Sequence, residues 1–212
     1  MSSVSPPFFY RWLSPEYLVC DMPAAEKVIY ITFDDGPIPG ATPDVIAILK
    51  RYKATATFFM VGDNVRKYPD LFTRVKDEGH AIGNHTFHHL NGWTTSPGAY
   101  LEDVRRCNEL TGTRLFRPPY GRFTPSQYFL LRKDYRFILW SVLTNDFNRN
   151  TTAEQCLKNA IDFTRDGSVV VFHDHLKSID KVRFALPRFI EHWSALGYRF
   201  EGIQEPRHDD RR

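Results

Sequence analysis

Residues 28–37 read Val-Ile-Tyr-Ile-Thr-Phe-Asp-Asp-Gly-Pro, and this stretch decides the expected fold. The nearly continuous apolar run Val28–Phe33 predicts a strand buried on both faces, as the strands of parallel sheets are. Two carboxylates, Asp34 and Asp35, follow at its carboxyl end. Functional groups of parallel α/β folds gather at the carboxyl ends of strands. The stretch therefore predicts a parallel strand that delivers two acidic groups to a functional edge.

Short β-rich runs alternate with amphipathic helical stretches along the rest of the chain, which is typical of βα units and a parallel sheet. Thr42 is expected to be the N-cap of the first helix, with Pro43 as its first residue. The expected strands cover 28–33, 57–61, 80–83, 114–117, 137–142, 168–172 and 198–201. The expected helices cover 42–52, 69–78, 97–110, 125–133, 153–165 and 182–196. This pattern predicts one α/β barrel or an open doubly wound sheet.

Composition excludes several classes of function. The net charge is +3, from 28 Lys and Arg against 25 Asp and Glu. This small excess of positive charge does not indicate a basic surface, so no nucleic acid partner is expected. The three cysteines, Cys20, Cys107 and Cys156, lie far apart without a Cys-x-x-Cys pair. Their number and spacing argue against a disulfide framework or a thiolate zinc site.

Polar or ionisable groups follow five of the expected strands. They are Asp34 and Asp35 after the first, Asn84 and His85 after the third, Arg117 at the end of the fourth, Asp146 past the fifth and His173 at the end of the sixth. Taken singly, an Asp-Asp-Gly-Pro run is typical of a turn, and two histidines four residues apart, such as His85 and His89, are often incidental. That pair could also lie on one face of a helical turn and bind a metal. The joint occurrence of these groups at successive strand ends predicts an active site.

The residue types point to hydrolysis. One carboxylate with two imidazoles can coordinate zinc and leave coordination positions open for water and substrate. A further carboxylate beside the metal and a distant histidine can supply a base and an acid. Two histidines and one carboxylate also describe non-haem Fe(II) oxygenases. The βα alternation and the order of Asp before His favour the hydrolase.

Five ordered motifs resemble those of the polysaccharide deacetylases of carbohydrate esterase family 4. They are Thr32-Phe33-Asp34-Asp35-Gly36-Pro37, His85-Thr86-Phe87-His88-His89, Arg117-Pro118-Pro119-Tyr120, Leu143-Thr144-Asn145-Asp146-Phe147 and Val171-Phe172-His173. The resemblance implies an α/β fold, a distorted and incomplete (β/α)7–8 barrel that forms a single domain. It also implies hydrolysis of N-acetyl groups on an N-acetylated carbohydrate, with release of acetate.

The resemblance assigns the first two motifs to the metal and the base. Asp35, His85 and His89 would bind a divalent metal, with Zn²⁺ expected and Co²⁺ or Ni²⁺ as alternatives. Asp34 would be the general base. Arg117, from the third motif, would orient it.

The remaining motif residues would complete the site. His173 would be the general acid, paired with Asp146. The backbone N–H of Tyr120 would face the oxyanion, and Val171 and Phe147 would contact the substrate.

Three positions depart from the family pattern. Leu143 stands where the family has Asp, Phe147 where it has Trp and Val171 where it has Leu. Val171 is a mild change in the pocket expected to hold the acetyl methyl group. Leu143 and Phe147 are expected on the wall of the substrate groove, so they bear on which substrate is accepted. These two departures also motivate an alternative function, a catalytically impaired glycan-binding protein on the same fold.

The ends of the chain lead to expectations about domains and location. Residues 1–25 are expected to be a lead-in that packs on the barrel, 26–203 the catalytic domain and 204–212 a polar tail. No run reaches the roughly 18 apolar residues of a membrane span. The N-terminus lacks a basic segment followed by an apolar one, so no signal peptide is expected. These features predict a cytoplasmic protein.

Overall fold

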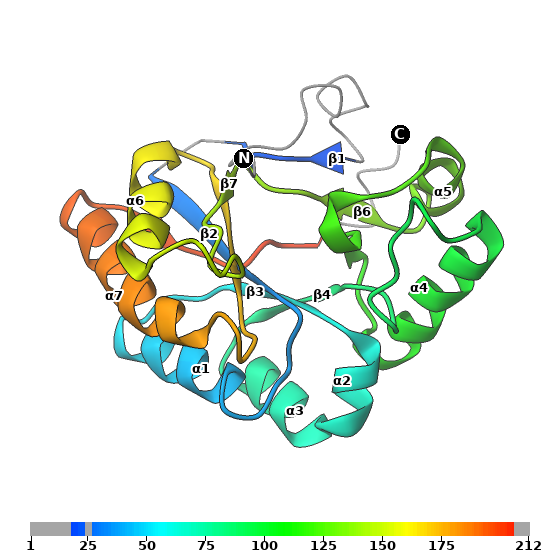
Figure 1. The fold of residues 1–212 in the computed structure, drawn as a ribbon, viewed down its shortest axis with the longest axis horizontal. Coiled ribbons are helices and arrows are strands. Elements are labelled where there is room, and N and C mark those ends of the chain that lie inside the picture. Colours follow the sequence, from blue (N-terminus) through cyan, green and yellow to red (C-terminus); the bar gives the residue numbers. More distant parts are fainter. Residues whose placement is uncertain (1–17, 24–26, 206–212) are drawn as a thin grey trace.

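The computed structural model describes residues 18–23 and 27–205, which form one curved parallel sheet with helices on its outer side (Figure 1). The strands are β1 (Leu18–Val19), β2 (Val28–Asp34), β3 (Thr57–Met60), β4 (Ala81–Asn84), β5 (Leu115–Phe116), β6 (Arg136–Ile138), β7 (Val142–Leu143), β8 (Val169–His173) and β9 (Arg199–Phe200). The helices are α1 (Thr42–Arg51), α2 (Gly62–Lys67), α3 (Pro69–Asp77), α4 (Pro97–Thr111), α5 (Pro125–Leu131), α6 (Ala153–Phe163) and α7 (Ile179–Ala195). The expected incomplete (β/α) barrel is confirmed.

The sheet has the order β1-β6-β5-β4-β3-β2-β8-β7, with β9 paired to β2. All of these strand pairs are parallel. The expected strand 137–142 is wrong, because it divides into β6, which lies beside β1 near one end of this order, and β7, which lies at the other end. Leu139 N donates to Val19 O on one side of the barrel, and Ser141 N donates to Val169 O on the other. The chain therefore crosses the open side of the barrel at Trp140.

Other sequence expectations also need correction. Thr42 is not the N-cap of α1: Ala41 is, and Thr42 is the first helical residue. The buried Thr42 hydroxyl instead donates to Asp174 Oδ2 at 2.6 Å. Helix α2 was not expected, because it begins with glycine and its six residues are too few to show a clear hydrophobic periodicity.

Strand β1 falls within the expected lead-in and pairs in parallel with β6. The expectations for residues 1–17, 24–26 and 206–212 lie outside the described residues. Within the described ranges, no helix is both long enough and apolar enough to cross a membrane.

The core lies between the sheet and its helices. The Phe33 ring stacks on Phe58 and Phe172 at centroid distances of 5.0 and 6.0 Å. These rings come from the adjacent strands β3, β2 and β8, and α1 and α7 pack over them. A second cluster, around Phe116 and Phe137, lies beneath α4 and α5. This packing fixes the carboxyl ends of the strands relative to one another.

Gly83 in β4 provides a test of this packing. A Cβ atom at Gly83 would lie 2.2 Å from the Phe59 ring, so Gly83→Ala should destabilise the protein by about 1–3 kcal/mol through overpacking. Gly98→Ala in α4 is the control, because no atom lies within 4 Å of its Cβ and alanine favours helix. The free energy of unfolding in urea should fall for the first variant only. Equal stability of both variants would contradict the packing described.

Candidate active site

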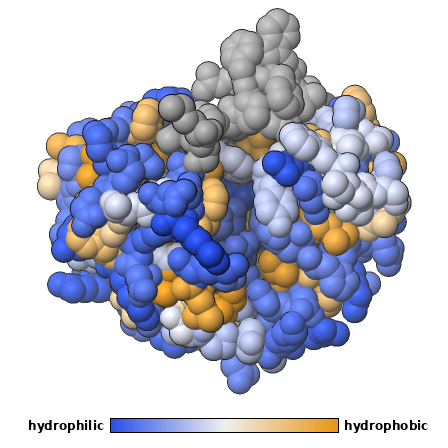
Figure 2. Space-filling view, in the orientation of Figure 1, coloured by the Kyte–Doolittle hydropathy of each residue, from blue (hydrophilic) through white to orange (hydrophobic). Residues whose placement is uncertain are grey.

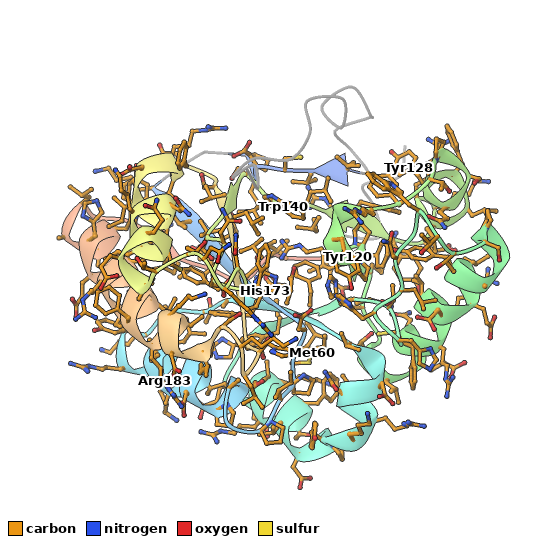
Figure 3. The ribbon with its side chains drawn as sticks, in the orientation of Figure 1. Met60, Tyr120, Tyr128, Trp140, His173 and Arg183 are labelled. Carbon is orange, nitrogen blue, oxygen red and sulfur yellow. The ribbon has the colours of Figure 1, made fainter. Side chains whose placement is uncertain are left out.

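A cavity of about 880 Å³ lies at the carboxyl ends of the strands. Its lining comes from the segments after β2, β3, β4, β5, β6, β7 and β8. Figure 2 shows the surface hollowed near the centre of this face. Tyr120, Trp140 and His173 lie around the same region in the view with side chains (Figure 3). The topology therefore brings loops that are far apart in sequence to one place.

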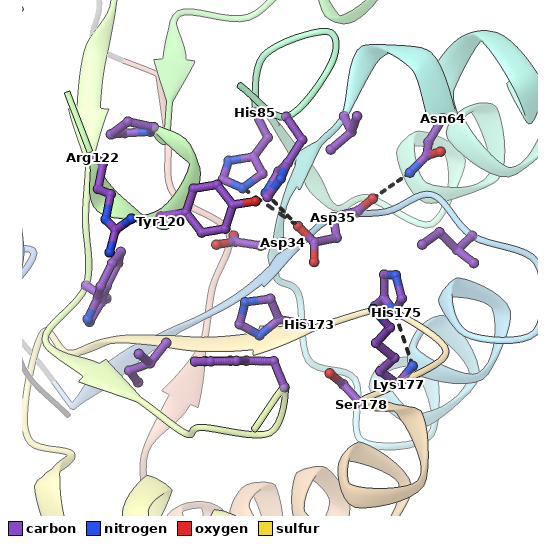
Figure 4. Close-up of a pocket in the computed structure, with 17 residues that line it drawn as sticks. Asp34, Asp35, Asn64, His85, Tyr120, Arg122, His173, His175, Lys177 and Ser178 are labelled. Carbon is purple, nitrogen blue, oxygen red and sulfur yellow. Dashed lines mark hydrogen bonds and ion pairs between the residues drawn. The ribbon is translucent and has the colours of Figure 1, made fainter. Parts of the chain in front are cut away.

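The cavity contains one group of side chains that could hold a metal. Ligand atoms of Asp35, His85 and His89 all lie within 4.8 Å of one another (Figure 4). Asp35 Oδ1 lies 3.2 Å from His89 Nε2 and 3.9 Å from His85 Nε2. The cluster is one carboxylate and two imidazoles, a donor set that suits zinc with positions left open.

The protonation states of this cluster suit a cation. Burial lowers the pKa of His85 to about 4, so its imidazole is neutral at pH 7. Its Nδ1 lies 2.6 Å from Arg117 O, which leaves Nε2 as the free ligand atom. Burial alone would raise the pKa of Asp35, but the hydrogen bond from His89 and the neighbouring imidazoles hold it below its usual range. Asp35 is therefore a carboxylate beside neutral His85.

His85 and His89 do not lie on one helical turn, which was one possibility that their spacing left open. Residues 85–90 form a loop in which Thr86 and His89 have φ angles of 63° and 57°. Left-handed backbone is uncommon for residues other than glycine and needs support from its surroundings. The loop conformation, rather than helical periodicity, brings the two imidazoles together.

Asp103 supports this loop and was missed at the level of sequence. Its Oδ2 accepts hydrogen bonds from the backbone N–H groups of Phe87 and His88, both at 2.9 Å. Its Oδ1 lies 2.5 Å from His88 Nδ1. Asp103 lies on the buried stripe of α4 between Tyr100 and Val104. An acid on an apolar helical stripe was the feature that could have identified it.

Asp174 supports the loop that carries Asp35, and it too was missed. Its Oδ1 accepts from Gly36 N at 3.0 Å and its Oδ2 accepts from Thr42. Burial raises the pKa of Asp174 to about 8, although the Thr42 hydroxyl favours the carboxylate. A Cβ at Gly36 would lie 2.0 Å from Asp174 Oδ2, so this contact requires glycine. Asp174 follows β8 directly, between His173 and His175, and it is fully buried.

Arg117 lies directly beneath Asp34. Its Nη1 donates to Asp34 Oδ1 and to Thr32 Oγ1, both at 2.7 Å. Its Nε and Nη2 donate to the carbonyl groups of Ile138 and Leu139 at 3.0 and 2.8 Å. The guanidinium is fully buried, and these bonds fix the direction of the Asp34 carboxylate.

His173 ends β8 next to Asp34, which is its register partner on β2. Its Nδ1 lies 2.8 Å from Asp146 Oδ1, and its backbone N–H donates to Asp146 Oδ2 at 2.7 Å. Burial would lower the pKa of His173, but the Asp146 carboxylate, with Asp35 and Asp34, raises it to about 10. His173 is therefore an imidazolium at neutral pH. It faces the cavity with a proton to donate.

The other expected substrate contacts differ in position. Tyr120, Phe147 and Leu143 line the cavity. Tyr120 has a φ of 60°, and its ring lies 4.8 Å from that of His89. Val171 is buried within β8 and is not among the residues that line the cavity, so the structure does not bring it to the surface of the site.

Known proteins are similar to this chain in sequence and in fold. The profile of the polysaccharide deacetylase family matches residues 21–135. A peptidoglycan-N-acetylglucosamine deacetylase of Bacillus cereus is 34% identical over 197 residues, which cover 89% of this chain and 92% of the relative. A chitooligosaccharide deacetylase of Azorhizobium caulinodans is 37% identical over 158 residues, which cover 70% of this chain and 74% of the relative.

A solved structure agrees with the sequence relatives. The crystal structure of a peptidoglycan N-acetylglucosamine deacetylase superimposes with a TM-score of 0.83 and 28% sequence identity. The superposition covers 93% of this chain and 95% of that chain. With a family profile that matches more than half of its residues, the chain belongs to the polysaccharide deacetylase family.

Proposed function

We propose that this protein is a metal-dependent N-deacetylase that removes acetyl groups from an amino-sugar glycan of the chitooligosaccharide or peptidoglycan type. One observation carries the proposal: the Asp–His–His cluster, the Arg117-bound Asp34 and the Asp146-bound His173 lie together at the carboxyl ends of the strands. The relatives named above act on glycans of these two types. Family membership argues against the oxygenase alternative.

Asp35, His85 and His89 would hold the ion, for which we propose Zn²⁺, with Co²⁺ or Ni²⁺ as alternatives. When bound, such an ion polarises the acetyl carbonyl and lowers the pKa of a water molecule. The neutral state of His85 and the ionised state of Asp35 support this ligand set.

The residues of the chain supply the proton transfers. Asp34 takes a proton from the attacking water, whose oxygen forms a bond to the amide carbon. The backbone N–H of Tyr120 is proposed to donate to the oxyanion that develops. His173 then gives its proton to the amide nitrogen as the carbon–nitrogen bond breaks. The products are acetate and a free amino sugar.

The substrate side of the site supports a second candidate. Leu143 replaces an acid of the family pattern and lines the cavity with Phe147. A glycan-binding protein without activity would fit these departures. The Asp35–His85–His89 cluster, the Arg117–Asp34 pair and the Asp146–His173 pair support the enzyme over this second candidate.

The proton-transfer roles are tested by Asp34→Asn and His173→Ala. Each variant should lose about 10²–10⁴-fold in kcat for acetate release from chitooligosaccharides, because it lacks the base or the acid. Bound metal, measured by elemental analysis, should persist in both. Asp180→Asn is the control, because that side chain is 89% exposed on α7. Wild-type turnover in either active-site variant would refute its role.

Metal dependence is tested by chelation. Acetate release should disappear after dialysis against a chelator and return with added Zn²⁺ or Co²⁺. His89→Ala should lower the metal content of the purified protein, whereas His192→Ala, on the exposed side of α7, should not. Full activity in metal-free protein would refute the metal site.

The pH dependence of kcat/KM tests the His173–Asp146 pair. His173 donates only when protonated, so activity should fall on the alkaline side as pH rises through its pKa of about 10. Asp146→Asn removes the carboxylate that raises this pKa, and the alkaline limb should move toward about pH 6.5. An unchanged alkaline limb in this variant would show that the pKa of a group other than His173 determines the loss of activity at high pH.

A further inference from the structure

Exposed apolar side chains gather around the mouth of the cavity. Trp93 is 57% exposed, Tyr120 59% and Phe147 43%. Tyr120 and Phe147 line the cavity itself, whereas Trp93 lies outside its lining, on the loop that follows the metal-ligand segment 85–89. Large aromatic rings left open to water beside a cavity mark a binding surface.

Arg122 connects Trp93 to the cavity. Its guanidinium carbon lies 4.6 Å from the centroid of the Trp93 ring and 5.9 Å from that of Tyr120. The Tyr120 ring in turn contacts His89. Figure 4 shows Arg122 beside Tyr120 at the edge of the cavity. We call Tyr120, Arg122 and Trp93 the aromatic ledge, which runs from a metal-ligand candidate to the outer surface.

The loop that carries Trp93 is held by groups other than its ring. Gln127 is buried, and its Nε2 donates to Gly92 O and Thr95 O at 2.9 and 3.0 Å, on either side of Trp93. The backbone N–H of Trp93 also donates to Asn91 Oδ1 at 3.0 Å. The Trp93 ring is therefore not needed to hold the loop together. A rigid loop that presents an aromatic ring loses little entropy on binding.

We propose that the aromatic ledge is a subsite for a sugar unit of the glycan chain beyond the unit that is deacetylated. Aromatic rings pack against the C–H faces of a pyranose ring, and the Arg122 guanidinium can donate to its hydroxyl or acetamido oxygens. In residues 18–23 and 27–205, no acidic side chain forms an ion pair with Arg122, so its donors are available to a ligand. The ledge would make the enzyme prefer oligomers to monomers.

This inference rests on the proposed function, because it assumes a glycan in the cavity. It adds a specific consequence: Trp93 contributes to the binding of long substrates and does not contact the sugar unit that is deacetylated. Trp93 lies outside the cavity lining and contacts the metal-ligand candidate His89 only through Arg122 and Tyr120, so we expect its removal to leave the metal cluster, Asp34 and His173 in place.

The test is kcat/KM for acetate release across N-acetylglucosamine and its oligomers up to the hexamer. Trp93→Ala should reduce the gain in kcat/KM with chain length by about tenfold, while the value for the shortest substrates stays within about twofold of wild type. Trp93→Phe should retain most of the gain. Phe129→Ala is the matched control. Phe129 resembles Trp93 in that its side chain is 56% exposed and an arginine guanidinium, that of Arg132, lies 4.8 Å from its ring centroid. Unlike the ledge, it lies on α5, away from the cavity lining.

A binding measurement separates this inference from the proposed function. Chitohexaose is titrated calorimetrically into chelator-treated protein, in which no turnover is expected. About tenfold weaker binding by Trp93→Ala than by wild type and Phe129→Ala would support the ledge even if no acetate were released. The proposed subsite would be overturned if all three proteins bound chitohexaose with equal affinity or if the wild type did not bind it. It would also be overturned if Trp93→Ala lowered kcat/KM equally for short and long substrates.

Discussion

The buried guanidinium of Arg117 is the interaction on which the site depends most. It joins β2, through Thr32 and Asp34, to the carbonyl groups of Ile138 and Leu139 on the segment that leaves β6. A buried charge is tolerated only when its donors are satisfied, and the ring of Phe59 packs against its face at 4.0 Å. The same residue's backbone oxygen lies against His85 Nδ1. One residue thus links β2 to the ends of β5 and β6 and contacts both the proposed base and a metal-ligand candidate.

Two buried acids complete this support from the outer layers. Asp103 on α4 holds the loop of His85 and His89, and Asp174 after β8 holds the turn at Gly36. Neither of these acids lines the cavity. The cluster around Asp35 is therefore built from loops whose backbone N–H groups donate to buried carboxyl groups. Such outer contacts determine how well ligands keep their geometry.

The fold and much of the site could be predicted from sequence because both repeat a strong local pattern. The apolar run Val28–Phe33 and the polar residues at later strand ends indicated parallel strands with a shared functional edge. Features that depend on tertiary packing could not be predicted. The division of 137–142 into two strands follows from the gap in the barrel, and the loop conformation of His85 and His89 follows from Asp103. The hydroxyl of Thr42 caps no helix because Asp174, 132 residues away in sequence, binds it.

The register of β2 and β8 has a consequence for motion within the molecule. Asp34 and His173 are paired positions on adjacent strands, so the spacing of their backbones is set by the ladder, at about 4.8 Å between strands. The Asp35 turn, the segment 85–90 and the Trp93 loop lie outside the ladder. A displacement of these loops would leave the backbone spacing of Asp34 and His173 unchanged, because the ladder sets it.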